Sequence, residues 1–306
     1  MPEAVRRALV NRIERDIPLS KFTTFFLGGP AELFLEVHTE EELIEAIRIA
    51  LEEKTPYFLL GGGSNLVVSD HGIRGLVIRN RSGNPDKVDK EKCLLTVSSG
   101  RPLSHFVGLA WRNVFTGAES FTGIPGTVGG AIYGNAGAYG KSMSDLLVSA
   151  LVLSPDGSLK NVGKEFFEFG YRQSKLKREP AHIINATFQL EKGERSQIQA
   201  KIKEISSQRH SKHPPRAIGS AGSFFQNLDP APGETRRRAA GEVLEKAGAK
   251  GLSVGGASVY EKHANFIVNH GEATSKEVKE LAQILKEKVA NLFGITLKEE
   301  VLYIGG

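Results

Sequence analysis

Glycine is concentrated in two short stretches of the chain, and glycine-rich loops can bind phosphate groups through their main chain. The longer stretch, residues 123–140, reads GIPGTVGGAIYGNAGAYG and holds seven glycines in 18 residues, where an average usage of about 7% would give one. The shorter stretch, GGGSNLVV, covers residues 61–68. Glycine lets the backbone approach a ligand closely, and successive N–H groups form a concave anion site. The two stretches predict a cradle for a large phosphorylated cofactor, and tight turns between strands are the alternative.

The elements around the shorter stretch argue against a doubly wound dinucleotide-binding fold. In that fold a GxGxxG loop joins a strand to a helix N-terminus, and an acidic residue follows about 20 positions later. Here the loop connects a predicted strand at residues 57–60 to another at residues 66–68. We therefore expect the nucleotide on loops that connect strands.

The length and the cysteine content of the chain limit the number of compact units and the cellular compartment that we expect. A chain of 306 residues is long enough for two or three compact units. Cys93 is the only cysteine, which excludes an intrachain disulfide and fits a reducing compartment. No apolar run reaches the roughly 20 residues that span a bilayer, and the N-terminal residues lack the apolar segment of a signal peptide. These features predict a cytoplasmic protein without a membrane partner.

The net charge of +5 makes nucleic acid a partner to consider. The only compact basic run, Arg236 to Arg238, lies on a predicted helix, where a solvated face is the commoner meaning. No nucleic-acid-binding module accompanies it, so we expect no nucleic-acid partner, and an enzyme with an anionic substrate fits the charge equally well. The eight histidines have no metal-ligand spacing, which predicts no metal site.

Alternating helical and strand signals predict an α+β protein. Thr39 with Glu42, and Thr274 with Glu277, form capping boxes at the starts of two helices. Pro155-Asp156-Gly157 marks a hairpin turn. An apolar stripe at helical spacing, from Val278 to Leu292, predicts a helix face that packs in a core. Helices are expected at residues 39–54, 102–113, 195–209, 235–247 and from 274 onward, and strands at 57–60, 66–68, 75–79, 94–98, 147–162, 181–190, 265–268 and 296–304.

Seven ordered motifs carry a resemblance to a known enzyme family. They are FTTFFLGGPAELF (residues 22–34), GGGSNLVV (61–68), TGIPGTVGGAIYGNAGAYG (122–140), YRQS (171–174), AGSFFQN (221–227), GGASVYEKHANFIVN (255–269) and EEVLYIGG (299–306). Together, over about residues 18–305, the chain resembles the UDP-N-acetylenolpyruvoylglucosamine reductases of bacterial peptidoglycan synthesis. Any one of these motifs alone would be weak evidence for the family, whereas seven of them in this order are specific to it.

The resemblance implies a fold and a reaction. The fold is that of the vanillyl-alcohol-oxidase-like (PCMH-type) flavoproteins, with FAD-binding subdomains at residues 1–80 and 81–192 and a C-terminal α/β substrate-binding domain at 193–306. We leave open whether the chain end packs back on the flavin domain. NADPH is implied as the reductant of a non-covalently bound FAD. The reduced flavin then converts UDP-N-acetyl-3-O-(1-carboxyvinyl)glucosamine into UDP-N-acetylmuramate.

The resemblance also assigns three catalytic residues, and the chemistry explains why each type is needed. Hydride addition to an enolpyruvyl group drives negative charge onto its carboxylate, and this charge needs fixed donors. Arg172 in YRQS matches the family's catalytic arginine, and its guanidinium can bind a carboxylate as a bidentate fork. Glu300 matches the catalytic glutamate, and Ser223 matches the proton donor to the α-carbon. Without the shared motifs, an ion pair for Arg172, a solvated Glu300 and a turn-capping Ser223 would be the ordinary interpretations.

The binding residues are carried over from the same motifs. For FAD the matching positions are Gly61, Gly62, Gly63, Ser64, Asn65, Leu66, Gly123, Ile124, Pro125, Gly126, Gly130, Asn135, Ala136 and Gly137. For the substrate they are Tyr171, Gln226, Asn227, Lys262, His263 and Asn265. His263 could equally be a buried, hydrogen-bonded histidine.

Some positions depart from the family pattern. Gln226 stands where the family usually carries Lys or Arg, and Leu228-Asp229 separate Asn227 from Pro230. The missing charge puts one phosphate or carboxylate contact in doubt. Two alternatives remain: a related flavin oxidase that passes electrons to oxygen, for which His71 could tether the flavin, and a nucleotide-binding protein without activity. A nucleotide-binding protein without activity needs no proton donor, so this alternative leaves Ser223 unexplained.

Overall fold

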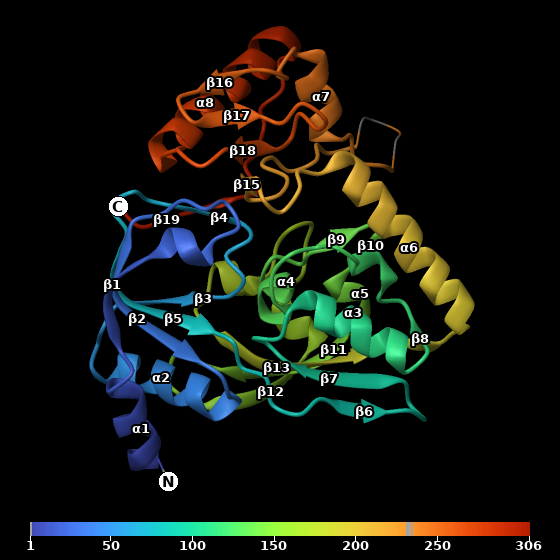
Figure 1. Cartoon of the computed structure of the whole chain (residues 1–306). Helices are drawn as coiled ribbons and strands as arrows, with labels where there is room; N and C mark the ends of the chain where they lie inside the picture. Colours follow the sequence, from blue (N-terminus) through green and yellow to red (C-terminus); the bar gives the residue numbers. More distant parts are fainter. Residues whose placement is uncertain (1, 231–232, 234) are drawn as a thin grey trace. The chain divides into compact units, whose positions relative to one another are not determined.

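The computed structural model describes residues 2–230, 233 and 235–306 (Figure 1). The chain forms two compact units, and each is built from three segments of the sequence. Unit 1 comprises residues 1–15, 33–62 and 75–209, and unit 2 comprises residues 16–32, 63–74 and 210–306. The first glycine stretch is divided between them, because the chain passes from unit 1 to unit 2 after Gly62.

A four-stranded sheet in the order β1-β2-β5-β3 begins the fold, and its strands are Glu14–Pro18 (β1), Pro30–Val37 (β2), Ile73–Asn80 (β5) and Tyr57–Leu60 (β3). Helices Pro2–Val10 (α1) and Glu40–Glu52 (α2) lie in unit 1. α2 starts as predicted, because the Thr39 hydroxyl accepts a hydrogen bond from the Glu42 N–H at 3.1 Å. β3 and β5 are parallel, and their register ends at Leu60 opposite Arg79, directly before the first glycine stretch.

The larger sheet of unit 1 is antiparallel and has the order β12-β11-β13-β7-β6. Its apolar face packs with helices and loops into one core, in which the Phe106 and Phe188 ring centroids lie 4.6 Å apart. The predicted hairpin around Asp156 is confirmed, since β11 and β12 pair antiparallel across it. The strands are Leu159–Gly163 (β12), Leu147–Leu153 (β11), His182–Gln189 (β13), Leu94–Ser98 (β7) and Lys87–Asp89 (β6), and the helices are Leu103–Arg112 (α3), Val128–Tyr133 (α4), Met143–Leu146 (α5) and Arg195–Lys212 (α6).

Short elements complete unit 1. Two small antiparallel pairs join Phe115–Thr116 (β8) to Glu191–Lys192 (β14), and Gly137–Ala138 (β9) to Lys141–Ser142 (β10). The 3₁₀ turns are Glu119–Phe121 (η2), Lys164–Phe167 (η3) and Lys175–Lys177 (η4).

Unit 2 has its own antiparallel sheet and its own core. The sheet order is β15-β18-β17-β16, with strands Gly219–Ser220 (β15), Ile267–Asn269 (β18), Ala257–Val259 (β17) and Ser253–Val254 (β16). A parallel pair joins Leu66–Val68 (β4) to Leu302–Ile304 (β19). The helices are Ala240–Lys246 (α7) and Ser275–Phe293 (α8), and Leu19–Phe22 forms a 3₁₀ turn (η1). The Thr274–Glu277 capping box at the start of α8 is confirmed.

Four predictions about local structure are wrong. The apolar stripe of α8 ends at Val289, because Leu292 is 58% exposed. Arg236 to Arg238 are not helical: the Arg238 carbonyl accepts a hydrogen bond from the Leu228 N–H, and α7 begins only at Ala240. The final strand is shorter than predicted and covers only β19. The longer glycine stretch is not all loop, because it contains α4.

The mixed helix-and-strand class predicted from the sequence is confirmed. The division into three consecutive domains stays a prediction. Among the described residues, no helix combines the length and the apolar character that a bilayer crossing requires.

Candidate active site

The two glycine stretches lie against each other in unit 1. A Cβ atom at Gly62 would lie 2.6 Å from the Gly126 Cα, and one at Gly61 would lie 2.8 Å from the Thr127 hydroxyl oxygen. Real Cβ atoms do not approach backbone this closely, so glycine is required where the two loops cross. The Leu103 N–H donates to the Gly126 carbonyl at 3.0 Å and fixes the second loop on the start of α3.

The N–H groups around this crossing indicate where an anion could bind. The first N–H groups of α4 are used internally, because those of Val128, Gly129 and Gly130 donate to the Arg101 carbonyl, the Ser99 carbonyl and the Thr127 hydroxyl. The N–H groups of Gly62 and Gly126, in contrast, donate to no acceptor within the described residues. The loops therefore fit a phosphate group at the crossing, and the N-terminus of α4 does not.

The other predicted flavin positions lie further along the two glycine stretches. Asn135 is 6% exposed, and its amide is engaged, donating to the Gly170 carbonyl at 2.9 Å and accepting from the Ser144 N–H at 3.1 Å. Gly137 is closed in by β10, since a Cβ there would lie 2.6 Å from the Lys141 carbonyl oxygen. In unit 1 the remaining positions lie in the longer stretch or at its α4 helix: Gly123, Ile124, Pro125, Gly130 and Ala136. In unit 2 they are Gly63, Ser64, Asn65 and Leu66, which lead into β4.

Arg172 is held at the tip of a tight turn in unit 1. Gly170 and Gln173 exchange backbone hydrogen bonds of 3.1 and 3.2 Å, which leaves Tyr171 and Arg172 as the two central residues. Arg172 has φ of +55°, a conformation that costs a non-glycine residue energy and that recurs at functional sites. Its Nη2 donates to the Gly137 carbonyl at 2.8 Å, and its guanidinium carbon lies 5.3 Å from the Tyr171 ring centroid. The turn therefore fixes the guanidinium beside the end of the longer glycine stretch.

Sequence reasoning missed Arg209, a second guanidinium in the same unit. A Cβ at Gly123 would lie 2.9 Å from the Arg209 Cδ, and the guanidinium carbon lies 5.8 Å from the Tyr139 ring centroid. Its buried Nε has no hydrogen-bond partner within the described residues. Burial lowers the pKa of Arg209, Tyr139 opposes this shift, and the charge of Arg172 adds to it. Two neighbouring positive charges favour the binding of an anion. The only sequence feature that could have pointed to Arg209 is its position at the end of a predicted polar helix.

In unit 2 the backbone brings Ser223 and Glu300 close together. The Glu300 N–H donates to the carbonyl of Phe224, the residue after Ser223, at 2.8 Å, and the Gln226 N–H donates to the Lys298 carbonyl at 2.8 Å. Residues 224–226 and 298–300 thus form a short antiparallel ladder around the bridge between Phe225 and Glu299. The same unit ties Glu300 to the first glycine stretch, because Asn65 Nδ2 donates to the Glu300 carbonyl at 3.0 Å.

The predicted substrate residues differ in their surroundings. Asn227 Oδ1 accepts from the Ala240 N–H at 3.2 Å, at the start of α7. His263 Nδ1 accepts from the Asn265 N–H at 3.2 Å, and burial lowers the pKa of His263, so the imidazole stays neutral at physiological pH. Lys262 is exposed, and Gln226 is half-buried. Each of these substrate assignments stays a prediction.

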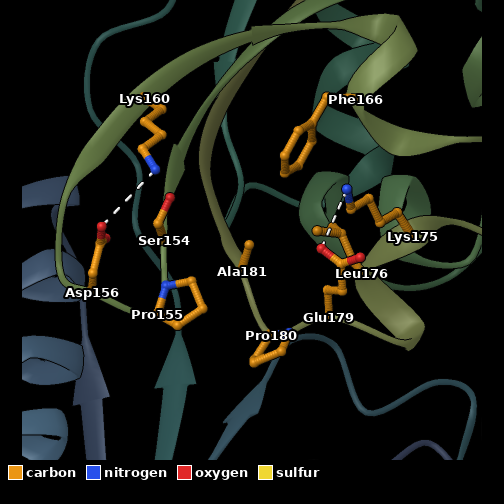
Figure 2. A pocket seen from close by; sticks show the side chains of 10 residues that line it. All are labelled: Ser154, Pro155, Asp156, Lys160, Phe166, Lys175, Leu176, Glu179, Pro180 and Ala181. Carbon is orange, nitrogen blue, oxygen red and sulfur yellow. Dashed lines mark ion pairs between the residues drawn. The ribbon is translucent and has the colours of Figure 1, made fainter.

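A hollow of about 320 Å³ lies next to the β11–β12 turn of unit 1. Figure 2 shows the side chains that line it. Its two lysines face acidic side chains: Lys160 lies 3.9 Å from Asp156, and Lys175 lies 3.2 Å from Glu179. None of the predicted site residues lines this hollow. Among the described residues, no group of three or more His, Cys, Asp or Glu side chains could hold a metal ion.

Comparison with known proteins identifies the family of this chain. The model of the FAD binding domain family matches residues 31–163, and that of the UDP-N-acetylenolpyruvoylglucosamine reductase C-terminal domain matches residues 213–304. The reductase of Lachnoclostridium phytofermentans is 38% identical over 297 residues, which cover 96% of this chain and 93% of the relative. The chain belongs to the UDP-N-acetylenolpyruvoylglucosamine reductase family.

Further relatives support the same assignment. The UDP-N-acetylenolpyruvoylglucosamine reductase of Clostridium perfringens is 37% identical over 290 residues, covering 95% of this chain and 92% of that protein. The crystal structure of the reductase (MurB) from Thermus caldophilus superposes with a TM-score of 0.78 at 34% identity, covering 96% of this chain and 99% of that one. The family predicted from seven motifs is therefore confirmed, and the chain is an oxidoreductase.

Proposed function

We propose that this MurB-family enzyme uses bound FAD and NADPH to reduce UDP-N-acetyl-3-O-(1-carboxyvinyl)glucosamine to UDP-N-acetylmuramate, in bacterial peptidoglycan synthesis. FAD, bound without a covalent link, supplies the hydride, and NADPH restores the reduced flavin. Family membership supports the reaction, and the crossed glycine loops with their two unengaged N–H groups support a site for the cofactor diphosphate.

The protein's own residues serve the addition of hydride and a proton across the carbon–carbon double bond of the substrate. Hydride reaches the β-carbon and drives negative charge through the α-carbon onto the carboxylate. The guanidinium of Arg172, fixed by its turn and by the Gly137 carbonyl, provides a rigid counter-charge for that carboxylate. Arg209 adds a second positive charge in the same unit.

Ser223 completes the reaction by donating its hydroxyl proton to the α-carbon. A hydroxyl is a weak acid, yet a carbanionic intermediate is basic enough to take its proton, whereas a carboxylate in that place would repel the intermediate. Glu300 lies in the segment that pairs with residues 224–226, and in our proposal its carboxyl group, protonated or through a water molecule, hydrogen-bonds the substrate carboxylate. The observation that carries the proposal is this ladder, which holds Ser223 and Glu300 together in a chain whose family reduces an enolpyruvyl sugar.

The experiment separates the two half-reactions by anaerobic stopped flow. Ser223→Ala should leave reduction of the flavin by NADPH nearly intact and slow reoxidation by the enolpyruvyl substrate by ~10²-fold or more, the scale of general acid catalysis. Ser220→Ala, in the same segment, is the matched control and should leave both rates unchanged. If Ser223→Ala slows neither half-reaction, or slows both equally, Ser223 is not the proton donor.

A further inference from the structure

Asn265 holds the segment that carries Ser223 through both its backbone and its side chain. The Phe224 N–H donates to the Asn265 carbonyl at 2.8 Å. The Phe225 N–H donates to Asn265 Oδ1 at 2.9 Å, and Asn265 Nδ2 donates back to the Phe225 carbonyl at 2.8 Å. The side-chain amide thus pairs with Phe225 as a neighbouring strand residue would. Asn265 is 3% exposed, so this pairing is shielded from water.

The two edges of this segment are held by different parts of unit 2. One edge pairs with residues 298–300, through the hydrogen bonds of Glu300 and Gln226. The other edge meets Asn265, whose side chain reaches Phe225 two residues after Ser223. Without the side chain, the N–H and carbonyl of Phe225 would lose their partners on this edge, and the segment would be free to shift relative to Glu300.

We propose that Asn265 is a positioning residue that fixes the Ser223 hydroxyl for proton transfer, instead of binding the substrate as its motif first indicated. The inference rests on the role proposed for Ser223. Only an amide offers a donor and an acceptor in one plane at this length. An aspartate would keep the bond from the Phe225 N–H but would turn a second oxygen toward the Phe225 carbonyl, and an alanine would remove both bonds.

A second buried asparagine of the same unit provides a matched control. Asn269 is 2% exposed, and its amide also holds backbone: Nδ2 donates to the Phe25 carbonyl at 2.9 Å, and Oδ1 accepts from the N–H groups of Gly271 and Ala273. Replacing either asparagine with alanine removes a similar set of buried hydrogen bonds. Of the two asparagines, Asn265 is the one that hydrogen-bonds the Phe224–Phe225 backbone.

The test compares Asn265→Ala with Asn269→Ala in the holoenzyme. Both variants should melt at a lower temperature than the wild type. Asn265→Ala should slow flavin reoxidation at saturating substrate by ~10- to 100-fold, the effect of a misplaced reacting group, with little change in substrate affinity or in flavin reduction. Asn269→Ala should keep the wild-type reoxidation rate. Equal rates in the two variants would overturn the proposal, as would a loss in Asn265→Ala that appears only as weaker substrate binding.

The double variant Ser223→Ala with Asn265→Ala separates this inference from the proposed function. If Asn265 acts through Ser223, its effect should disappear once Ser223 is alanine. An effect that persists in full contradicts the positioning role. A normal rate in Ser223→Ala refutes the proton-donor assignment itself, whereas a slow Ser223→Ala with a normal Asn265→Ala refutes only this inference. Should Asn265→Ala fail to fold, Asn265→Asp keeps the volume and one hydrogen bond, and the same slowing is expected of it.

Discussion

The crossing of the two glycine loops gives a sharp test of the cofactor site, through the substitution Gly62→Ala. A Cβ at this position would lie 2.6 Å from the Gly126 Cα and 3.2 Å from its carbonyl carbon. Carbon atoms make favourable contacts at about 3.5–4.0 Å, so the loops would have to separate by roughly 1 Å. Overpacking of this kind typically costs ~1–3 kcal/mol. The displaced groups include the N–H groups of Gly62 and Gly126, which we expect to meet the FAD diphosphate.

Loss of one hydrogen bond to a charged group is worth ~1.5–3 kcal/mol, so FAD should bind roughly ten- to a hundredfold more weakly to Gly62→Ala. The measurement is a fluorescence titration of flavin-free protein with FAD, together with the melting temperature of the flavin-free protein. Gly134→Ala is the control from the longer glycine stretch, because a Cβ there would lie 3.6 Å from the Gly130 carbonyl oxygen, an ordinary contact. Wild-type FAD affinity in Gly62→Ala would refute the cradle, and an equal loss in Gly134→Ala would show that the effect is not specific to the crossing.

Two further predictions concern unit 1. Arg209→Ala should raise the KM for the UDP-sugar by about tenfold, the value of one charge-assisted hydrogen bond, while Gln208→Ala, one residue earlier on α6, should leave it unchanged in steady-state assays. His182, whose Nε2 lies 2.7 Å from the Tyr57 hydroxyl, has its pKa lowered to about 4 by burial. The unfolded chain takes up this proton near pH 6.5, whereas the folded chain takes it up only near pH 4. The free energy of unfolding should therefore fall by about 3 kcal/mol between pH 6.5 and pH 4 and level off below. The measurement is urea unfolding of the wild type and of His182→Phe between pH 7 and pH 4. The free energy of unfolding of the variant should depend less on pH.

The sequence was most informative where a local pattern decides the structure. Thr39 and Thr274 mark helix starts because a side-chain oxygen satisfies an N–H of the first turn, and this chemistry involves residues three positions apart. Pro155-Asp156-Gly157 likewise specifies its own hairpin. The glycine stretches predicted close backbone approach, and the structure shows the two loops touching. The partner of each loop could not be derived from the pattern itself.

The failures share a physical cause, which is tertiary contact that overrides local preference. The predicted helix at residues 235–247 loses its first turn because Arg238 pairs with Leu228 instead. Leu292 continues the helical spacing of the α8 stripe, yet it lies beyond the core and is exposed. Arg209 was passed over because a polar helix gives no sign of what its last turn contacts.

The hydrogen bonds of unit 2 join motifs that lie far apart in the sequence. Asn65 donates to the carbonyl of Glu300, 235 positions later, and the Leu302 N–H returns a bond of 2.9 Å to the Asn65 carbonyl. β4 and β19 extend this pairing as a parallel ladder. Glu300 in turn binds the Phe224 carbonyl, and Asn265 binds Phe225. A displacement of the first glycine loop therefore acts on the backbone of Glu300 directly and on the Ser223 segment through one more hydrogen bond.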